Sequence, residues 1–166
     1  MESDEKEFLH SNIIHRYYVN FFLSKIVQEI FIRANLHDVS KYSDKEFPGF
    51  KGAIYYVKGP WGKENIPDII KEQLRTSIEE HHKTNDHHPE FHDEGMEGMD
   101  LIQLLEMAVD WRSAMIRHGN HDIDENIRVG QKRFGYPDFF AKILRNTLKK
   151  IQRYELEADL HLPDLK

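Results

Sequence analysis

The sequence contains no cysteine, and this absence removes several classes of site at once. Disulfide bonds, zinc sites built from thiolates and iron–sulfur clusters all require that side chain. Any metal bound by this chain must therefore be held by nitrogen and oxygen atoms.

Long apolar runs and an excess of positive charge are also missing. No run reaches the roughly 20 apolar residues of a membrane-spanning helix, and the N-terminus is acidic, unlike the cationic start of a secretion signal. The net charge of -6 argues against general nucleic-acid binding, because such proteins carry a basic face that neutralises phosphates. These absences predict a cytoplasmic protein without a membrane partner, and they leave a small phosphate ligand open.

Apolar residues recur at steps of three and four along residues 7–34, 67–82, 99–117 and 135–160, a spacing that predicts helices. Shorter helices are expected at 37–47 and 125–134. Residues 48–66 are rich in glycine and predict a long loop of the kind that often forms a lid; Gly59, Pro60 and Trp61 within it either cover a pocket or form a turn. No segment alternates as a strand does. The prediction is an all-α fold, a single-domain bundle of five to seven helices over residues 1–166.

Histidine is the residue in unexpected excess. The chain has 11, and four of them lie within eight residues at the end of a predicted helix: His81, His82, His87 and His88. Imidazoles this close together would repel one another if protonated. A metal site explains the run, and so does a solvated polar turn with incidental histidines.

Two further features carry chemistry. His37 and Asp38 are adjacent, so on a helix their side chains point about 100° apart and can hold one ion together, with Lys41 a turn later on the face of His37. Asp110 is a carboxylate in the most apolar predicted helix, residues 99–117, which we expect to be buried on most sides. A buried carboxylate requires a cation or an ion-pair partner. Either a metal or an arginine would meet that requirement.

The order H…HD…HH…D on successive predicted segments resembles the HD-domain superfamily of metal-dependent phosphohydrolases, whose fold is an all-α bundle. The stretch His37-Asp38-Val39-Ser40-Lys41 is similar to the HD-x-x-K form of the HD-GYP branch, and His81-His82 with Pro89 is similar to its HH…P element. Val109-Asp110-Trp111-Arg112-Ser113-Ala114 resembles the D-x-x-D-A element, with Ser113 in place of the second aspartate. The motifs HD-x-SK, N-x-HHPE and DW together also resemble a small HD-like family of phages and bacteria.

The resemblance implies a divalent transition metal and assigns roles residue by residue. The implied ligands of the first ion are His15, His37, Asp38 and Asp110, and Lys41 would contact a phosphate. His82 and His88 are the expected additions for a second ion, followed by His81 and His87. A histidine that dinuclear members place between the HD and HH pairs has no match here. Imidazoles and carboxylates suit manganese, iron, cobalt, nickel or zinc.

We therefore expect a phosphohydrolase that acts on a small phosphate ester, above all a nucleotide. A bound ion would acidify a water molecule and polarise a phosphoryl oxygen, and Lys41 would neutralise charge on the transferring group. Glu106, Glu90 or a histidine of the 81–88 run is the expected general base. Two alternatives stay open: an HD-type di-iron oxygenase, and a non-catalytic module that binds a nucleotide and leaves it intact.

Overall fold

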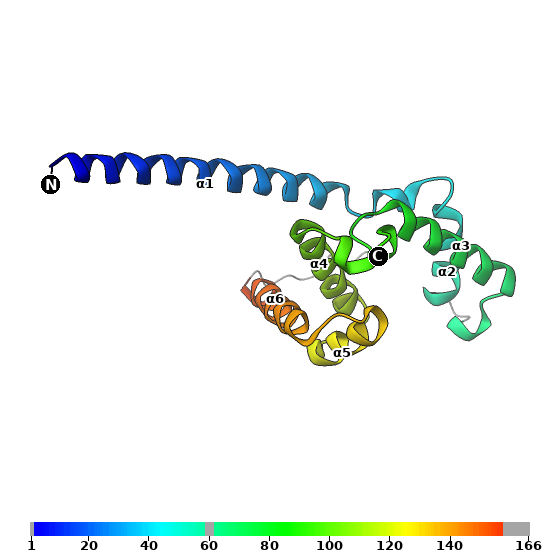
Figure 1. Ribbon diagram of the computed structural model, residues 1–166. Coiled ribbons are helices and arrows are strands. Elements are labelled where there is room, and N and C mark those ends of the chain that lie inside the picture. Colours follow the sequence, from blue (N-terminus) through cyan, green and yellow to red (C-terminus); the bar gives the residue numbers. More distant parts are fainter. Residues whose placement is uncertain (1, 59–61, 158–166) are drawn as a thin grey trace. The chain divides into compact units, whose positions relative to one another are not determined.

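The computed structural model describes residues 2–58 and 62–157, and within these ranges it contains six α-helices, four short 3-10 helices and no strand (Figure 1). The α-helices are α1 (Glu2–Leu36), α2 (Phe47–Lys58), α3 (Asp68–Thr84), α4 (Leu101–Arg117), α5 (Ile123–Phe134) and α6 (Asp138–Glu157). The 3-10 helices are η1 (Val39–Tyr42), η2 (Lys63–Asn65), η3 (Pro89–Phe91) and η4 (Gly95–Gly98). The predicted all-α fold is confirmed.

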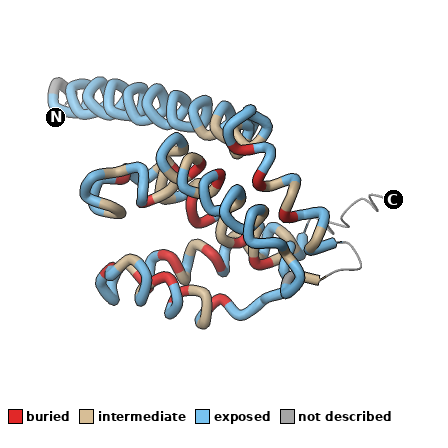
Figure 2. Tube along the Cα trace, turned by 90° about the vertical axis from the view of Figure 1, so that its right-hand side faces the viewer, coloured by how far each residue is buried: buried red, intermediate tan, exposed pale blue. Residues whose placement is uncertain are grey.

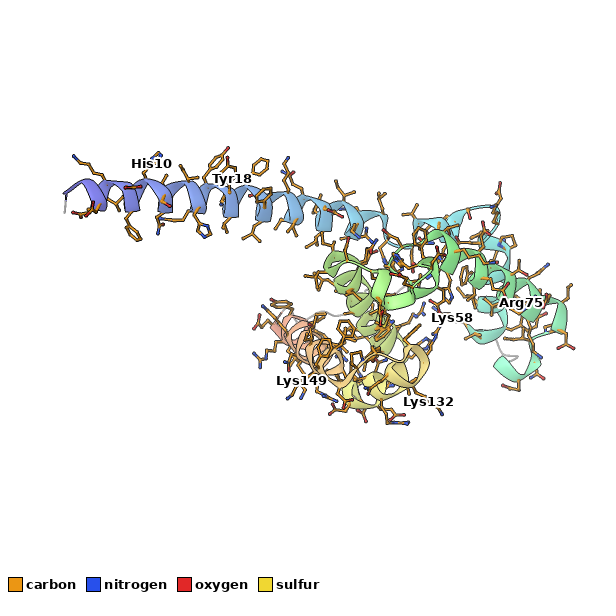
Figure 3. The ribbon with its side chains drawn as sticks, viewed as in Figure 1. His10, Tyr18, Lys58, Arg75, Lys132 and Lys149 are labelled. Carbon is orange, nitrogen blue, oxygen red and sulfur yellow. The ribbon has the colours of Figure 1, made fainter. Side chains whose placement is uncertain are left out.

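The chain divides into an N-terminal unit, Met1–His37, and a C-terminal unit, Asp38–Lys166. The N-terminal unit is helix α1, which is exposed along almost its whole length (Figure 2). Figure 3 shows side chains on both sides of this helix, with His10 and Tyr18 on the upper side. No helix in the described ranges is both long and apolar enough to cross a membrane. The single domain expected over residues 1–166 stays a prediction.

Helix α2 replaces most of the loop predicted for residues 48–66. Pro48 lies in the first turn of this helix, where its missing N–H is tolerated. Gly49 is buried, and a Cβ atom at this position would lie 2.4 Å from the backbone oxygen of Gln73 and from Oγ of Ser77. The glycine that suggested a loop thus allows α2 to pack closely on α3. Gly59, Pro60 and Trp61 lie outside the described residues.

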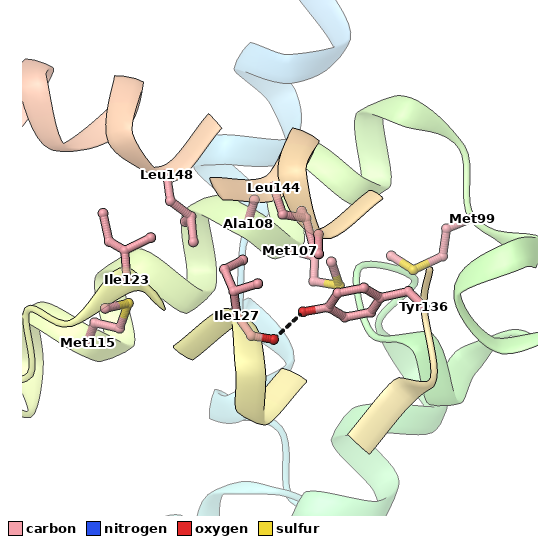
Figure 4. Packing of buried hydrophobic residues seen from close by; sticks show 10 residues of the cluster. Met99, Met107, Ala108, Met115, Ile123, Ile127, Tyr136, Leu144 and Leu148 are labelled. Carbon is pink, nitrogen blue, oxygen red and sulfur yellow. Dashed lines mark hydrogen bonds between the residues drawn. The ribbon is translucent and has the colours of Figure 1, made fainter. Parts of the chain in front are cut away.

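The apolar core of the C-terminal unit lies among α4, α5 and α6 (Figure 4). Met107, Ile127 and Leu148 are almost completely buried there, and the hydroxyl of Tyr136 donates a 2.8 Å hydrogen bond to the backbone oxygen of Ile127. Buried hydroxyl and carbonyl groups need such partners because they have left water. The core fixes α4, which carries part of the polar site described below.

Helix α4 begins at a capping box. The side chain of Asp100 accepts hydrogen bonds from the backbone N–H groups of Ile102 and Gln103, and the Gln103 side chain accepts one from the N–H of Asp100. These bonds satisfy donors that have no partner inside the helix. The expectation that α4 is buried on most sides is not met, since Leu101 is 83% exposed and Val109 also lies at the surface. The buried residues of α4 are Met107, Ala108, Arg112 and Met115.

Candidate metal centre

Asp38 begins the C-terminal unit in an unusual backbone conformation. Its φ is 59° and its ψ 11°, and it is the only non-glycine residue with positive φ in the described part of the chain. Aspartate tolerates this left-handed region better than most residues, at a cost on the order of 1 kcal/mol. The residue is also the N-cap of η1, so the predicted helix over 37–47 is replaced by a sharp turn and a short 3-10 helix.

The end of α3 supplies the first histidine of the site. Ser77 and His81 are buried, one helical turn apart, and continue the face of α3 that carries Ile70 and Leu74. The helix ends at Thr84 and is followed by its C-cap, Asn85, whose carbonyl accepts a hydrogen bond from the N–H of His88. This turn brings the chain back, so that His87 and His88 lie beside the helix that they follow.

One group in the C-terminal unit has the composition of a metal site: Asp38, His81, His87 and His88. One nitrogen or oxygen atom of each residue lies within 4.8 Å of the corresponding atoms of the other three. Nε2 of His81 is 3.1 Å from Oδ1 of Asp38 and 3.0 Å from Nε2 of His88. Nε2 of His87 is 3.7 Å from the same Asp38 oxygen. Three imidazoles and a carboxylate therefore converge on one point.

A buried carboxylate lies behind His81. Glu46 is 1% exposed, and its Oε2 atom is 2.8 Å from Nδ1 of His81 and accepts a 3.1 Å hydrogen bond from Oγ of Ser40. Asn85 donates from its side-chain nitrogen to Ser40 Oγ at 2.8 Å. A carboxylate at Nδ1 places the proton on that nitrogen, and the lone pair of Nε2 then faces Asp38 and His88.

The same arrangement recurs at His87, which is 3% exposed. Its Nδ1 atom lies 3.4 Å from Oε1 of Glu106, a residue of α4, while Nε2 faces Asp38. Two of the three histidines thus have a carboxylate at Nδ1 and direct Nε2 inward. Metal-binding histidines are commonly oriented in this way, because the carboxylate fixes the tautomer and raises the basicity of the ligand nitrogen.

His88 completes the group of nitrogen donors. Burial lowers its pKa to about 3, with further lowering by the neighbouring histidines His87, His82 and His81, while the charge of Asp110 acts in the opposite direction. The imidazole of His88 is therefore neutral at pH 7, which is the form that binds metals. Nε2 of His88 lies 3.0 Å from Nε2 of His81, a separation that either a shared proton or a shared cation explains.

Lys41 provides positive charge at the edge of this group. Its Nζ atom forms an ion pair with Oδ2 of Asp38, the oxygen that does not face the histidines, and lies 5.4 Å from the ring centre of Phe50. The Asp38 carboxylate therefore divides its two oxygens between the group of histidines and a lysine. The sequence predicted one helix that carries His37, Asp38 and Lys41. In the structure, Lys41 instead belongs to the short 3-10 helix η1 and reaches Asp38 from there.

His82 and Glu90 lie to one side of the group. Nδ1 of His82 is 3.8 Å from Oε1 of Glu90, and that oxygen accepts a 2.5 Å hydrogen bond from Nη2 of Arg133. The rings of His82 and His88 are 4.6 Å apart between their centres. Burial lowers the pKa of His82, Glu90 raises it, and the charges of Arg133, His81 and Lys41 lower it. The sequence favoured His82 over His81 as a ligand; in the structure His81 holds the inward position.

The remaining predicted ligands have three different positions. Asp110 is half-buried on α4, and one of its oxygens lies within 4.8 Å of a nitrogen of His87. His37 is the last residue of the N-terminal unit and is bonded along the chain to Asp38. His15 lies on α1 in the N-terminal unit and is exposed. Within the C-terminal unit, the structure therefore brings Asp110, Asp38 and His88 into one neighbourhood.

Comparison with known protein families gives a match over most of the chain. The chain matches a family described as a family of unknown function (DUF5662) over residues 4–154. The chain belongs to this family. No curated protein and no solved structure matches it. The span shared with the DUF5662 family covers most of both units and every residue of the candidate centre, from Asp38 to Asp110.

The donor set of this DUF5662 member fits a divalent transition metal. With metal–nitrogen and metal–oxygen distances of about 2.0–2.2 Å, neighbouring ligand atoms lie about 2.9–3.5 Å apart. The separations at His81 fall in this range, and the 3.7 Å separation at His87 is slightly above it. Imidazole and carboxylate ligands without thiolate suit zinc, iron, cobalt, nickel or manganese. Asp38, His81, His87 and His88 would hold the ion.

Glu46 was missed by the sequence analysis, and Ser40 and Asn85 were noted only as letters of motifs. Nothing in the charged run around Glu46 distinguishes it from an exposed glutamate, since its burial results from packing between α2 and α3. His81 could have been chosen over His82. The spacing Ile70, Leu74, Ser77 and His81 marks the apolar face of α3, and His82 lies one residue beyond it.

Proposed function

We propose that this protein is a metal-dependent phosphohydrolase that acts on a small phosphate ester, with a nucleotide as the favoured substrate. The observation that carries the proposal is the division of Asp38, with one oxygen facing three histidines and the other paired with Lys41. A metal and an ammonium group beside one carboxylate form a site for an oxyanion. The resemblance of the HD-x-SK and HHPE motifs to HD-domain phosphohydrolases supports the same conclusion.

A divalent ion held by Asp38 and the three histidines would supply a Lewis acid for a phosphoryl oxygen and would acidify a water molecule. Lys41 has a separate task in this proposal. Its ammonium group is partly exposed and can move from Asp38 to a phosphoryl oxygen, where it neutralises the charge that develops on the transferring group. Lysine suits this role because it is a flexible point charge.

Glu106 and Glu90 take different positions in this proposal. Glu106 lies against Nδ1 of His87 and acts through that imidazole, so it is a positioning residue. Glu90 is held by Arg133 and lies at the edge of the group. Of the two candidate bases, Glu106 is therefore the one joined directly to a proposed ligand.

The metal content of the purified protein tests whether the proposed ligands bind an ion. We expect about one divalent ion per chain in the purified protein, and its loss in Asp38→Ala and His81→Ala. His82→Ala is the matched control, because His82 adjoins His81 but faces Glu90; this variant should keep the metal. His37→Ala and Asp110→Ala, measured alongside, extend the test to the ligands implied by the resemblance. Full metal content in both Asp38→Ala and His81→Ala would overturn the proposal.

Hydrolysis tests the second step. A panel of nucleotides is incubated with the protein and manganese, cobalt or zinc, and released phosphate or nucleoside is measured. We expect activity that falls at least 100-fold in Asp38→Ala, and a rise in KM or a loss of kcat in Lys41→Ala. A metal-loaded protein that binds nucleotides and cleaves none of them would be a binding module instead.

A di-iron oxygenase is the second candidate, and one observation favours it. Asp86, His87 and Glu106 form another group of ligand atoms within 4.8 Å, and it is richer in carboxylate oxygen than the first. Carboxylate and imidazole ligands also bind iron. Two irons per chain after growth in iron-rich medium, with oxygen consumed in the presence of a reductant, would favour this function over hydrolysis.

A further inference from the structure

Arg133 on α5 is an exposed cation held by one exposed partner. Its side chain is 57% exposed, and its Nη2 atom donates a 2.5 Å hydrogen bond to Oε1 of Glu90, whose side chain is 34% exposed. The guanidinium lies over the ring of Phe134, 4.6 Å from the ring centre. Stacking on an aromatic ring orients the planar group and leaves its remaining N–H donors available.

A short series of contacts leads from Arg133 to the candidate metal centre. The Glu90 oxygen that Arg133 holds is 3.8 Å from His82 Nδ1, and the His82 ring is 4.6 Å from that of His88. His88 is one of the proposed ligands. All of these residues belong to the C-terminal unit, so a continuous series of side-chain contacts joins the Arg133 guanidinium to the proposed ligand His88.

A cleft of about 770 Å³ opens beside this pair. Glu90 and Arg133 line it together with apolar side chains that include Phe134, Tyr136 and Phe140. Among the described residues that line the cleft, Arg133 is the only lysine or arginine, whereas Asp93, Glu94 and Glu97 are acidic. An anionic group that entered the cleft would be attracted to Arg133 and repelled by the carboxylates.

We propose that Arg133 recognises a second phosphoryl group of the substrate, and that the Glu90 carboxylate occupies the place of that group in this structure. The inference rests on the proposed function, since the first phosphoryl group is the one placed at Asp38 and Lys41. It names the substrate class as a compound with two linked phosphoryl groups, such as a nucleoside diphosphate.

Exchange of the carboxylate for a phosphoryl group is energetically feasible. Exposed ion pairs of this kind contribute little to stability, so little is lost when Glu90 is displaced. A phosphoryl group carries more charge and accepts the paired N–H donors of a guanidinium, which matches its geometry. Arginine is suited to this role for the same reason.

The test compares two probes and two arginines. Inorganic pyrophosphate and inorganic phosphate are titrated into the metal-loaded protein by calorimetry, with Arg133→Gln beside the wild type. We expect the affinity for pyrophosphate to fall about 10- to 100-fold in the variant, and the affinity for phosphate to change less than about twofold. Arg128→Gln is the control, because Arg128 lies on the same helix, is also exposed and pairs with Glu125.

Glu90→Gln gives the reciprocal test. Removal of the competing charge should tighten pyrophosphate binding several-fold, whereas Glu125→Gln should leave it unchanged. Equal affinities for pyrophosphate in the wild type, Arg133→Gln and Glu90→Gln would overturn the inference and leave Arg133 as a structural partner of Glu90. A different result is that the wild type hydrolyses no nucleotide while Arg133→Gln still binds pyrophosphate more weakly than the wild type does. In that case the proposed function fails and the anion site at Arg133 remains.

Discussion

The C-terminal unit has two buried regions of opposite chemistry. Among α4, α5 and α6 the buried side chains are apolar, as Met107, Ile127 and Leu148 show (Figure 4), with the exception of Arg112, which pairs with Glu155. Around the end of α3 the buried side chains are Glu46, Ser77, His81 and His87. Burial of apolar surface stabilises a fold, whereas burial of charged groups costs free energy unless their partners are present.

The difference indicates where stability and function reside. The apolar core needs no ligand to account for its composition. The polar region has a set of hydrogen-bonded carboxylates and imidazoles whose inward nitrogens are best satisfied by a cation. Variants in the first region should therefore change the free energy of unfolding, and variants in the second should change metal affinity more than folding.

The largest effect is expected in the apolar core. Leu148 is 0% exposed, so Leu148→Ala should lower the free energy of unfolding by about 2–5 kcal/mol, through lost burial and the cavity left behind. Urea denaturation followed by circular dichroism measures the change. Leu156→Ala on the same helix is the control, because Leu156 is largely exposed and should change the value by less than about 0.5 kcal/mol. A small effect of Leu148→Ala would show that this region is not the main source of stability.

Much of the fold follows from patterns of local sequence. The spacing of apolar residues predicted α1, α3, α4 and α6, and Pro67 correctly marked the start of α3. The main failure was α2. Gly49 and Gly52 were interpreted as loop residues because glycine is unfavourable in helices, but at Gly49 the close approach of α3 leaves no room for a Cβ atom. Tertiary packing, which the sequence does not display, outweighed the local preference.

The candidate site was predicted in part. Asp38, His88 and Asp110 were selected from sequence and lie in one neighbourhood of the C-terminal unit, and Lys41 pairs with Asp38. The ranking of His82 above His81 came from a motif and ignored the apolar face of α3. Glu46 was beyond prediction, because it is joined to His81 across 35 residues of sequence and only the packing of α2 on α3 brings it there. Long-range polar pairs carry no local periodicity.

An intermediate effect is expected at the polar region. Glu46→Gln keeps the shape of the side chain and removes its charge, so His81 should remain in place while its Nε2 becomes a weaker ligand. We expect metal affinity to fall about 10- to 100-fold, as is typical when the carboxylate behind a ligand histidine is changed. Competition with a chromophoric chelator measures the affinity, and denaturation of the metal-free protein should show little change.

The control for Glu46→Gln is Glu80→Gln. Glu80 also lies on helix α3, directly before His81, but its side chain pairs with the exposed Lys45. Its variant should bind the metal as the wild type does. If Glu46→Gln instead lowers the free energy of unfolding and leaves metal affinity intact, the contrast between the two buried regions is wrong and Glu46 belongs to the stabilising core.

The smallest effect is expected at Tyr136, a polar group inside the apolar core. Tyr136→Phe removes the hydroxyl that donates to the Ile127 carbonyl, and should lower the free energy of unfolding by about 0.5–1.5 kcal/mol at pH 7. Burial raises the pKa of Tyr136 from 10.0 to about 12, an effect that the charge of Arg145 opposes. Because ionisation is disfavoured in the folded state, this contribution to stability is complete below pH 10 and is lost as the pH rises toward 12. Urea denaturation at pH 7, 10 and 11.5 should therefore show that the difference in the free energy of unfolding between the wild type and Tyr136→Phe becomes smaller as the pH rises. A difference that stays constant would indicate that the hydroxyl titrates as it does in the unfolded chain.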